Sequence, residues 1–540
     1  MNHLRKICVA IILAAVTPVF AGGILTNTNQ NLAFNRMMSR EGSIGIDGVY
    51  YNPAGVAFLK PGNYLSLGWQ MASQSRTIEN DYHFFTNNTQ NPTTPREFRG
   101  TAFAPVLPSI QYAHNWERFS VQANFGVIGG GGKCTFKNGL GSFEKIVAET
   151  ALGAVGLAGA LDNALGQEMF TSPQMFGKKG EYSYDAYMRG RSYYYGLSVA
   201  GAYKLTDNLA VSAGVRGVYV LTNYFGYVRD IKVGNMPLYM VLDPSKTNAA
   251  NIELNCDQSG TGFTPILGVD FKLKHWNFSA KYEFKTRIRL KNESVNQAPS
   301  IGNLPENLGG SIAKAVATKA IAQGMPEEQA YAQGLTYAKQ ILTTPGVVKT
   351  MTGLKEQFDT KLAEATGEFA DGAKIAGDIP ALLTLGVGYT PVDALRINAG
   401  FHYFYDRQAT AYKHREDKLK RGTIEWNAGV EYDASKLITV SAGWQNTNYG
   451  LTDEYMDDKS FVVSSNSVGA GAVMHLTKKM DLNVAYFHTF YGHKKTAKTV
   501  ELKTIEKTES GIKYNTVNEL YSADYTRNNN VWAVGIDIKF

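Results

Sequence analysis

The stretch Trp276-Asn277-Phe278-Ser279-Ala280-Lys281-Tyr282-Glu283-Phe284-Lys285 alternates apolar and polar residues one by one. Because successive side chains of a β-strand point to opposite faces, this pattern predicts a strand with one apolar face and one polar, charged face. The same split recurs in residues 209–215, 395–406, 482–486 and 532–540. The chain is therefore predicted to be all-β.

A soluble sandwich of two sheets would also alternate, so other features must separate it from a membrane barrel. The predicted strands reach about ten residues and carry aromatic residues near their ends, as in the girdles of outer-membrane barrels. Short polar links join neighbouring strands, and much longer irregular segments lie between these hairpins. The short links are residues 206–208, 392–394, 434–436 and 477–479. Short turns on one side and long loops on the other favour a transmembrane antiparallel β-barrel.

The alternation predicts about fourteen strands within residues 62–540. The strands running one way lie near 62–73, 118–128, 208–228, 275–290, 394–407, 437–448 and 480–491. The returning strands lie near 106–115, 187–204, 262–273, 380–390, 422–433, 466–476 and 530–540. An even number lets the chain close on itself with both ends on the periplasmic side. A barrel of this size has a lumen that is either plugged or open to water.

Composition excludes several other classes of protein. Of the 540 residues, 44% are hydrophobic and the mean hydropathy is −0.22, which does not suit a bundle of membrane-spanning helices. The 54 Lys and Arg against 47 Asp and Glu are spread along the chain, so no nucleic-acid partner is expected. With Cys8 in the leader, only Cys134 and Cys256 remain, and the sequence leaves open whether they pair.

The N-terminus has the features of a secretory signal peptide. Arg5 and Lys6 precede an apolar run over residues 7–20, and small residues allow cleavage after Ala21. Residues 1–21 are therefore expected to be removed from an exported chain.

Residues 22–61, between this leader and the first strand, show no clear strand alternation. They include Asn52-Pro53-Ala54-Gly55. Since some forty residues must be accommodated, we expect them to lie in the lumen as a plug, here called the hatch.

Two insertions, 129–185 and 291–378, interrupt the strand pattern on the long-loop side. The first contains a predicted helix over 142–165 with Ser142 as its N-cap. The second contains predicted helices near 311–322, 327–342 and 354–369. They form either ordinary loop caps or an apolar groove that collects hydrophobic ligands.

With the hatch and its Asn52-Pro53-Ala54 motif in place, the chain resembles the FadL-type outer-membrane transporters of long-chain fatty acids and other hydrophobic compounds. The resemblance covers nearly the whole mature chain and includes two strand pairs, at 379–400 and 426–444. It implies a bacterial outer-membrane channel for hydrophobic small molecules, with long-chain fatty acids as the leading cargo. A general porin or a surface adhesin is the alternative.

In that family the ligand leaves sideways at a kink in the third strand. Here the third strand covers residues 119–128 and ends in Gly129, Gly130, Gly131 and Gly132. Glycines mark bulges and bends, so these four are the candidates for a lateral gate. The alternative is that the run only begins a loop.

A fatty-acid carboxylate would need a cation in the lumen. Arg216 and Arg396 point inward by alternation and are the candidates, although lumen acids such as Glu283, Glu425 and Glu431 would compete for them.

No catalytic site, metal site or cofactor is predicted, because His402, His475 and His488 stand in no ligand or triad spacing, and the protein is not expected to be an enzyme. The expected partners are the hydrophobic ligand, outer-membrane lipid, and the barrel-assembly machinery acting on the strand that ends in Phe540. The barrel is expected to be a monomer.

Overall fold

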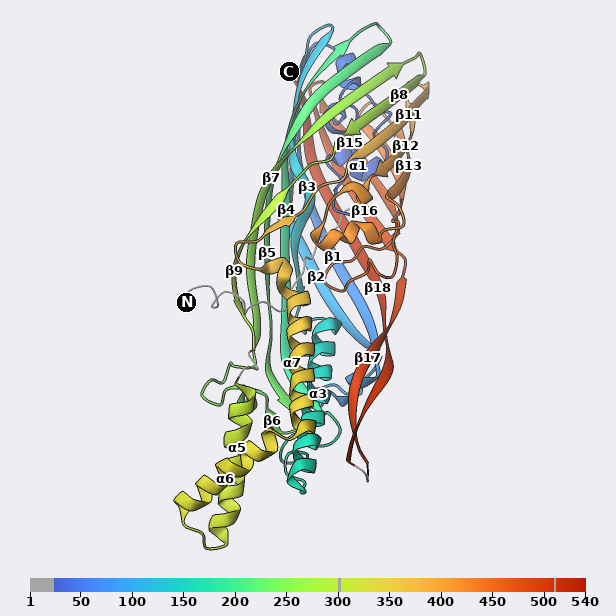
Figure 1. Ribbon diagram of the computed structural model, residues 1–540. Coiled ribbons are helices and arrows are strands. Elements are labelled where there is room, and N and C mark those ends of the chain that lie inside the picture. Colours follow the sequence, from blue (N-terminus) through green and yellow to red (C-terminus); the bar gives the residue numbers. More distant parts are fainter. Residues whose placement is uncertain (1–23, 300–302, 509–510) are drawn as a thin grey trace.

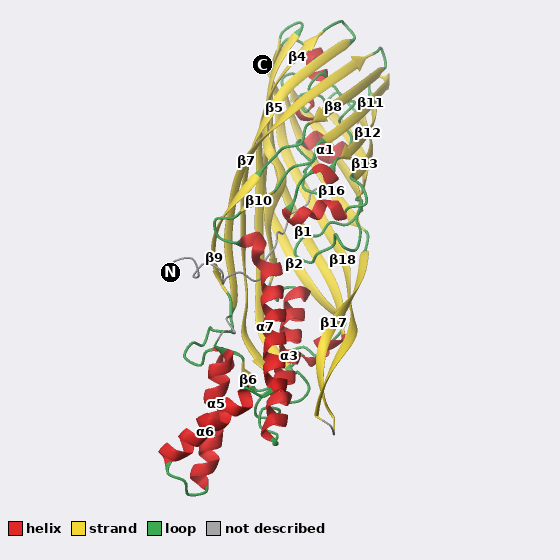
Figure 2. Ribbon diagram, viewed as in Figure 1, coloured by secondary structure: helices red, strands yellow, loops and turns green. Residues whose placement is uncertain are grey.

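A computed structural model describes residues 24–299, 303–508 and 511–540. The predicted signal peptide, residues 1–21, lies outside these residues. The molecule is a long, closed β-barrel with helices inside one half and further helices at the other end (Figures 1 and 2). The C-terminus lies at the end with the short turns, which is the periplasmic end of such barrels.

The wall has fourteen antiparallel strand positions, which confirms the predicted number. They are β1 (Gly62–Tyr82), β2 (Arg96–Asn115), β3 (Phe119–Phe136), β4 (Tyr182–Lys204), β5 (Leu209–Val233), β7 (Ile252–Lys272), β8 (Trp276–Glu283) continued by β9 (Arg289–Gln297), β10 (Lys374–Ala376) continued by β11 (Leu382–Val392), β12 (Leu395–Phe404), β13 (Thr423–Asp433), β14 (Ile438–Asn448), β15 (Ser465–Thr477), β16 (Met480–Tyr491) and β18 (Gly511–Lys539). Pairing of β1 with β18, from Tyr64 opposite Lys539 to Tyr82 opposite Tyr521, closes the barrel.

Several strands continue beyond the predicted ends, always toward the loop end. β3 continues to Phe136 and β5 to Val233, and β17 (Lys494–Thr508) pairs with β18 in a ribbon that projects past the wall. The ends of both predicted insertions therefore belong to the wall: 129–136 and 182–185 are strand residues, as are 291–297 and 374–376. In these extensions apolar residues such as Cys134 and Phe136 face inward and polar residues such as Lys133 face outward, so they lack the apolar-out, polar-in alternation that marks a membrane strand.

Exposure follows the predicted alternation. Trp276 and Phe278 on the outer face are 44% and 40% exposed, whereas Lys281 and Glu283 on the inner face are 4% and 3% exposed. Outward apolar residues of this kind recur around the wall. They include Leu67, Trp69, Ile110, Leu197, Val215, Leu267, Leu385, Trp426, Val440, Val468 and Trp532. An apolar outer belt around a polar interior is the arrangement that lipid requires.

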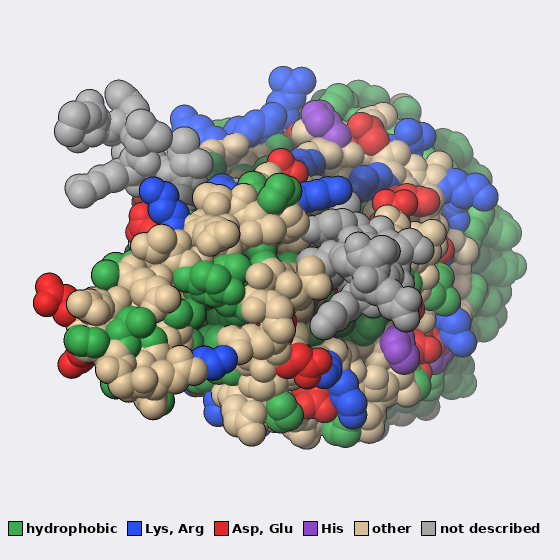
Figure 3. Space-filling model, turned by 60° about the horizontal axis from the view of Figure 1, so that its bottom comes forward, with side chains coloured by type: hydrophobic (Ala, Val, Ile, Leu, Met, Phe, Trp, Pro, Cys, Tyr) green, Lys and Arg blue, Asp and Glu red, His purple; other side chains and the backbone are tan. Residues whose placement is uncertain are grey.

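The helical insertions are confirmed at the loop end. The helices are α3 (Gly141–Leu165), α4 (Tyr239–Leu242), α5 (Leu304–Ala322), α6 (Glu327–Leu342) and α7 (Pro345–Thr366). α3 and α7 pack against each other, and α5 and α6 form an arm beyond the wall (Figure 1). Seen from this end, hydrophobic side chains are exposed among polar ones, with Lys and Arg distributed around them (Figure 3). No helix of the described residues has the length and hydropathy to span a membrane.

An apolar core joins α3 to the extended wall. Phe143, Val147 and Leu161 of α3 are buried with Val228 and Ile252 of the wall. The predicted N-cap at Ser142 is wrong, because Leu140 occupies that position and makes no side-chain cap.

Asp458, in the loop between β14 and β15, supplies the missing cap, since the Ser142 N–H donates to its Oδ2 at 2.7 Å. Burial and the charge of Asp457 raise the pKa of Asp458 to about 7. The contact of the β14–β15 loop with the start of α3 therefore favours the protonated form of Asp458. This contact is strongest below the ordinary pKa of an aspartate, about 4, and weakens as the pH rises toward 7.

We expect amides of residues 449–464 to exchange faster as the pH is raised from 5 to 7, by up to about tenfold per pH unit after correction for intrinsic exchange. Hydrogen-exchange mass spectrometry of the purified barrel measures this. Asp458→Asn should remove the pH dependence, and Asp393→Asn, in an exposed turn, should retain it. A pH dependence unchanged in Asp458→Asn would contradict the assignment.

Cys134 and Cys256 are both free and buried, so the structure answers the question of pairing that the sequence left open. Each belongs to the apolar core at the loop end.

Candidate functional site

The described part of the hatch, residues 24–61, fills the lumen with α1 (Leu32–Met37), α2 (Gly48–Tyr51) and the 3₁₀ turn η1 (Gly55–Phe58). Asn31 begins α1 by accepting a hydrogen bond from the Ala33 N–H at 2.8 Å. Its Nδ2 donates to Ser66 Oγ at 3.1 Å and to Gln111 Oε1 at 2.9 Å. The polar inner face of the wall thus binds the hatch through buried amides, which must be paired where water is excluded.

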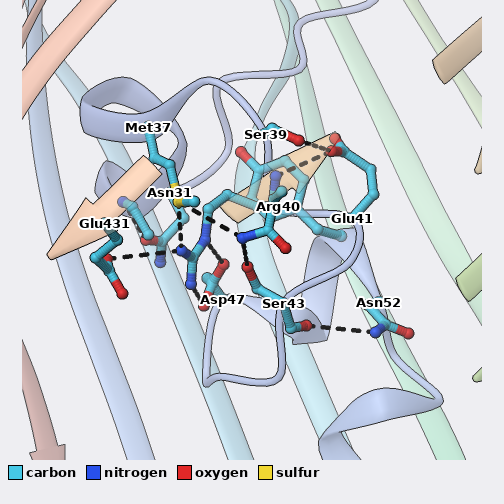
Figure 4. Close-up of polar contacts among 12 residues, drawn as sticks. Asn31, Met37, Ser39, Arg40, Glu41, Ser43, Asp47, Asn52 and Glu431 are labelled. Atoms are coloured by element: carbon cyan, nitrogen blue, oxygen red, sulfur yellow. Dashed lines mark hydrogen bonds and ion pairs between the residues drawn. The ribbon is translucent and has the colours of Figure 1, made fainter. Parts of the chain in front are cut away.

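A group of buried ion pairs holds α1 and the following turn (Figure 4). Glu431 of β13 accepts from Arg36 and lies 3.8 Å from Arg40 Nη1. Arg40 also pairs with Asp47 at 2.7 Å. Arg396 of β12 donates to Glu431 at 2.7 Å and also pairs with Asp433. The Glu431 carboxylate of the wall therefore interacts with three arginines, two of them from the hatch.

A second hatch contact is made by a histidine that the sequence left without partners. His402 of β12 contacts Glu41 of the hatch at 2.9 Å and Glu425 of β13 at 2.8 Å, and all three side chains are buried. The register places His402 directly opposite Glu425. The sequence signal for this contact was that His402 and Glu425 both face inward on adjacent predicted strands.

The Asn52-Pro53-Ala54-Gly55 motif fixes the end of the hatch. The Asn52 Oδ1 accepts from the Gly55 N–H at 3.1 Å, and its Nδ2 donates to Asp270 of β7. The Pro53 carbonyl accepts from Gln122 Nε2 of β3 at 2.8 Å. Asn52 suits this position because its side chain both accepts from a turn and donates to the wall. The motif thereby ties the hatch to two strands.

The wall is interrupted between β2 and β3. Their pairing runs from Asn115 opposite Ser120 to Ser109 opposite Gly126, and resumes only at Phe103 opposite Lys133. Residues 104–108 and 127–132 between these points are not paired with each other. The interruption contains all four predicted gate glycines, which are therefore strand residues and not the start of a loop.

The local sequence explains the interruption. Pro105 and Pro108 of β2 have no N–H to donate to a ladder. On β3 the pairing with β4 shifts register at 127–129 and again at 130–132, and Gly130 has φ +69°. The two prolines were visible in the sequence and, together with the glycine run, could have located this break.

Residues of the hatch occupy the interruption from inside. The Asn27 N–H donates to the Ile128 carbonyl at 2.8 Å, and Asn27 Nδ2 donates to the carbonyls of Val127 at 3.1 Å and Gly130 at 2.8 Å. Gln30 Nε2 also donates to the Val127 carbonyl, at 2.9 Å. The adjoining cavity has about 10 Å³ of free volume, room for about one water. The hatch thus closes the gap and satisfies backbone groups that lipid could not.

The first carboxylate candidate, Arg216, lies in a buried cluster beneath the hatch. It pairs with Glu283 at 2.6 Å, and Lys281 pairs with the same carboxylate at 2.8 Å. Lys281 also donates to the Tyr50 carbonyl of α2 at 2.7 Å, and both cations lie over the Tyr50 ring. The two cations thus share the carboxylate of Glu283, and Glu41 of the hatch lies close enough to act on Lys281.

The second candidate, Arg396, lies elsewhere. It is 30% exposed, and its two carboxylate partners, Glu431 and Asp433, occupy its guanidinium. The structure does not bring Arg216 and Arg396 into one site.

These features define the class of protein. A closed fourteen-strand barrel with an apolar outer wall and a polar, plugged lumen is a multi-pass β-barrel of the bacterial outer membrane.

Comparison with known proteins then gives the particular fold. No family model and no curated protein matches the chain. A Pseudomonas aeruginosa FadL homologue is similar in structure, with 14% identity, a TM-score of 0.57, and coverage of 96% of this chain and 100% of that chain. The fold is therefore that of a FadL-type barrel.

Two further structures were found at lower similarity. The Pseudomonas putida toluene transporter TodX has 12% identity and a TM-score of 0.48, and the Ralstonia pickettii toluene transporter TbuX has 12% identity and a TM-score of 0.45. Each alignment covers 92% of this chain and 94% of the other.

Proposed function

We propose that this protein is an outer-membrane channel for hydrophobic small molecules, with long-chain fatty acids as the leading cargo. Ligand enters among the helices at the loop end, passes into the lumen by diffusion, and leaves sideways between β2 and β3. The observation that carries the proposal is the break in pairing between residues 104–108 of β2 and 127–132 of β3, which the hatch closes from inside.

A sideways exit suits the chemistry of such ligands. Moving a hydrocarbon from an apolar site into water costs about 0.8 kcal/mol per methylene group. An opening in the wall at the level of the apolar belt leads instead into lipid. Residues 22–61 serve as the movable hatch, because their contacts at the gap are hydrogen bonds that a small displacement breaks.

The hatch also bears on the alternative functions. A general porin needs a water-filled lumen, and an adhesin needs no gap in its wall. The buried hatch, held by Arg36 and Arg40, argues against the first, and the interrupted pairing argues against the second.

Arg216 is the better candidate for a cargo carboxylate. Arg216 shares its one directly bound carboxylate, Glu283, with Lys281, whereas Arg396 has two carboxylate partners. We expect Arg216→Gln to lower fatty-acid affinity at least fivefold while leaving toluene affinity unchanged. Isothermal titration of the purified protein measures both. Arg396→Gln serves as the control, and an equal loss for the two variants or the two ligands would contradict this role.

The experiment that tests the exit is Gly130→Ala. A Cβ there would lie 2.5 Å from the Ser192 carbonyl oxygen, and the positive φ adds strain, so the substitution opposes the bulge. We expect uptake of a labelled long-chain fatty acid by cells to fall at least fivefold, while binding to the purified protein persists.

Gly217→Ala on β5 is the matched control, because its nearest neighbour would be 3.8 Å away and its φ is ordinary. Unchanged uptake in a folded Gly130→Ala variant would argue for an exit elsewhere. Loss of binding together with uptake would place the glycines in the capture site.

The strand ending in Phe540 is the proposed contact of the barrel-assembly machinery. The N–H and carbonyl of Phe540 pair with Asn63 at 3.0 and 2.9 Å, so this residue completes the closure. The barrel is proposed to work as a monomer.

A further inference from the structure

The outer wall carries a polar depression just beyond the apolar belt, on the side toward the loops. It spans β18, β1, β2 and β3 and has a volume of about 770 Å³. Its lining includes Ser73, Arg99, Thr101, Lys133, Thr135 and Asn530. The lining contains two cations and no carboxylate.

The cations of this depression have no acidic partner. Among the residues that the structure describes, no ion pair involves Arg99 or Lys133, and both side chains are exposed. Arg191 of β4 lies opposite Lys133 and is likewise exposed and without an ion pair in that part of the chain. The nearest outward acids are Glu97, two residues from Arg99 on β2, and Glu79, which lies opposite Glu97 on β1, and both lie farther from the belt. The excess of positive charge therefore faces the zone where lipid headgroups lie.

An apolar groove of about 470 Å³ lies next to the depression, within the belt. Its walls include Trp69, Met71, Tyr486 and Trp532, and it reaches Ala470 of β15. The two hollows share β1 and β18. Met71 pairs with Trp532, and the next outward pair on the same strands is Ser73 with Asn530. Since outward residues two apart lie about 7 Å from each other, the lining of the groove directly adjoins that of the polar depression on these two strands.

We propose that this face binds one phosphorylated glycolipid of the outer leaflet, with its phosphate held by Arg99 and Lys133 and an acyl chain in the groove. Charge-assisted hydrogen bonds from guanidinium and ammonium groups, with threonine hydroxyls beside them, are the donors that a phosphate prefers. The depression is larger than one phosphate needs, and its hydroxyl and amide side chains suit sugar hydroxyls. The aromatic walls suit a chain at the membrane interface.

The test is native mass spectrometry of the purified full-length protein in detergent. The probes are bisphosphorylated hexa-acylated lipid A, the same glycolipid without its phosphates, and phosphatidylglycerol. We expect one tightly bound bisphosphorylated lipid, with an affinity at least tenfold above that of the other two probes. Equal binding of the dephosphorylated glycolipid or of phosphatidylglycerol would overturn the proposal.

Variants separate the two parts of the site. Arg99→Gln with Lys133→Gln should reduce the phosphate preference to threefold or less, whereas Lys436→Gln with Lys478→Gln, in turns at the opposite end, should retain it. Lys133→Gln alone should give an intermediate preference and serves if the double variant does not fold. Ala470→Trp should fill the groove and weaken both glycolipid forms alike. Unchanged affinities in the folded Arg99 and Lys133 variants would refute the site.

Discussion

Deletion of residues 22–50 is expected to convert the protein into a leaky pore that still assembles. The deletion removes α1 and all of α2 except Tyr51, together with the side chains that close the gap between β2 and β3. Closure of the wall by β1 and β18 does not involve these residues. We expect the ion conductance of single barrels in planar bilayers to rise at least tenfold, because a lumen filled by a buried segment becomes filled by water.

Replacing residues 304–342 with a short Gly-Ser linker provides the control. This change removes α5 and α6, which lie outside the barrel (Figure 1), and should leave the conductance as it is. If the 22–50 deletion folds and its conductance stays at the level of the intact protein, the segment does not plug the lumen.

Glu431→Gln is expected to loosen the hatch without unfolding the barrel. The substitution removes the charge shared by Arg36, Arg40 and Arg396. Breaking a buried ion pair costs about 3–5 kcal/mol, because the remaining charge loses its partner where water is scarce. In this variant Arg40 retains its ion pair with Asp47, whereas Arg36 retains a hydrogen bond to Ser441 and no ion pair among the described residues. The loss of stability therefore affects α1, which contains Arg36.

Limited proteolysis and conductance noise measure this loosening. Cleavage within 24–61 should become at least tenfold faster, while the thermal transition of the barrel changes by a few degrees at most. Asp185→Asn is the matched control, since its pair with Arg229 is nearly half exposed and contributes about 0–1 kcal/mol. Equal protease resistance of Glu431→Gln and the intact protein would contradict the anchoring role.

Much of the wall could be predicted because lipid imposes a simple rule on each strand. Trp276 and Phe278 face outward and Lys281 inward, as the alternation requires, and this rule found all fourteen strands. It failed where strands leave the membrane. In the outer part of β5, up to Val233, the apolar residues Val228, Ile231 and Val233 face inward against the α3 core and the outer face meets water, so the membrane rule of apolar-out and polar-in no longer applies.

The site was predictable only in part, since its contacts join residues far apart in the chain. Asn27 meets Val127, and Arg36 meets Glu431, through a tertiary arrangement that no local pattern encodes. Alternation predicted that inward acids such as Glu431 would compete for inward cations, and the structure pairs Glu431 with Arg396. The specific partner of Arg216, Glu283, is likewise an inward acid on a neighbouring part of the wall.

The length of the extended strands bears on which layer is the main barrier for a hydrophobic solute. At about 3.3 Å per residue and a tilt near 40°, the 25 residues of β5 rise roughly 60 Å, whereas an apolar belt is about 25 Å tall. On this side of the barrel the wall therefore stands well above the belt, in the hydrated layer outside the membrane, whereas β12, with 10 residues, is little taller than the belt. For an oily molecule that layer, and not the bilayer, is the obstacle. With the proposed sideways exit at membrane level, the tall side of the barrel would shield such a molecule from this layer, and the last step would be partitioning into lipid.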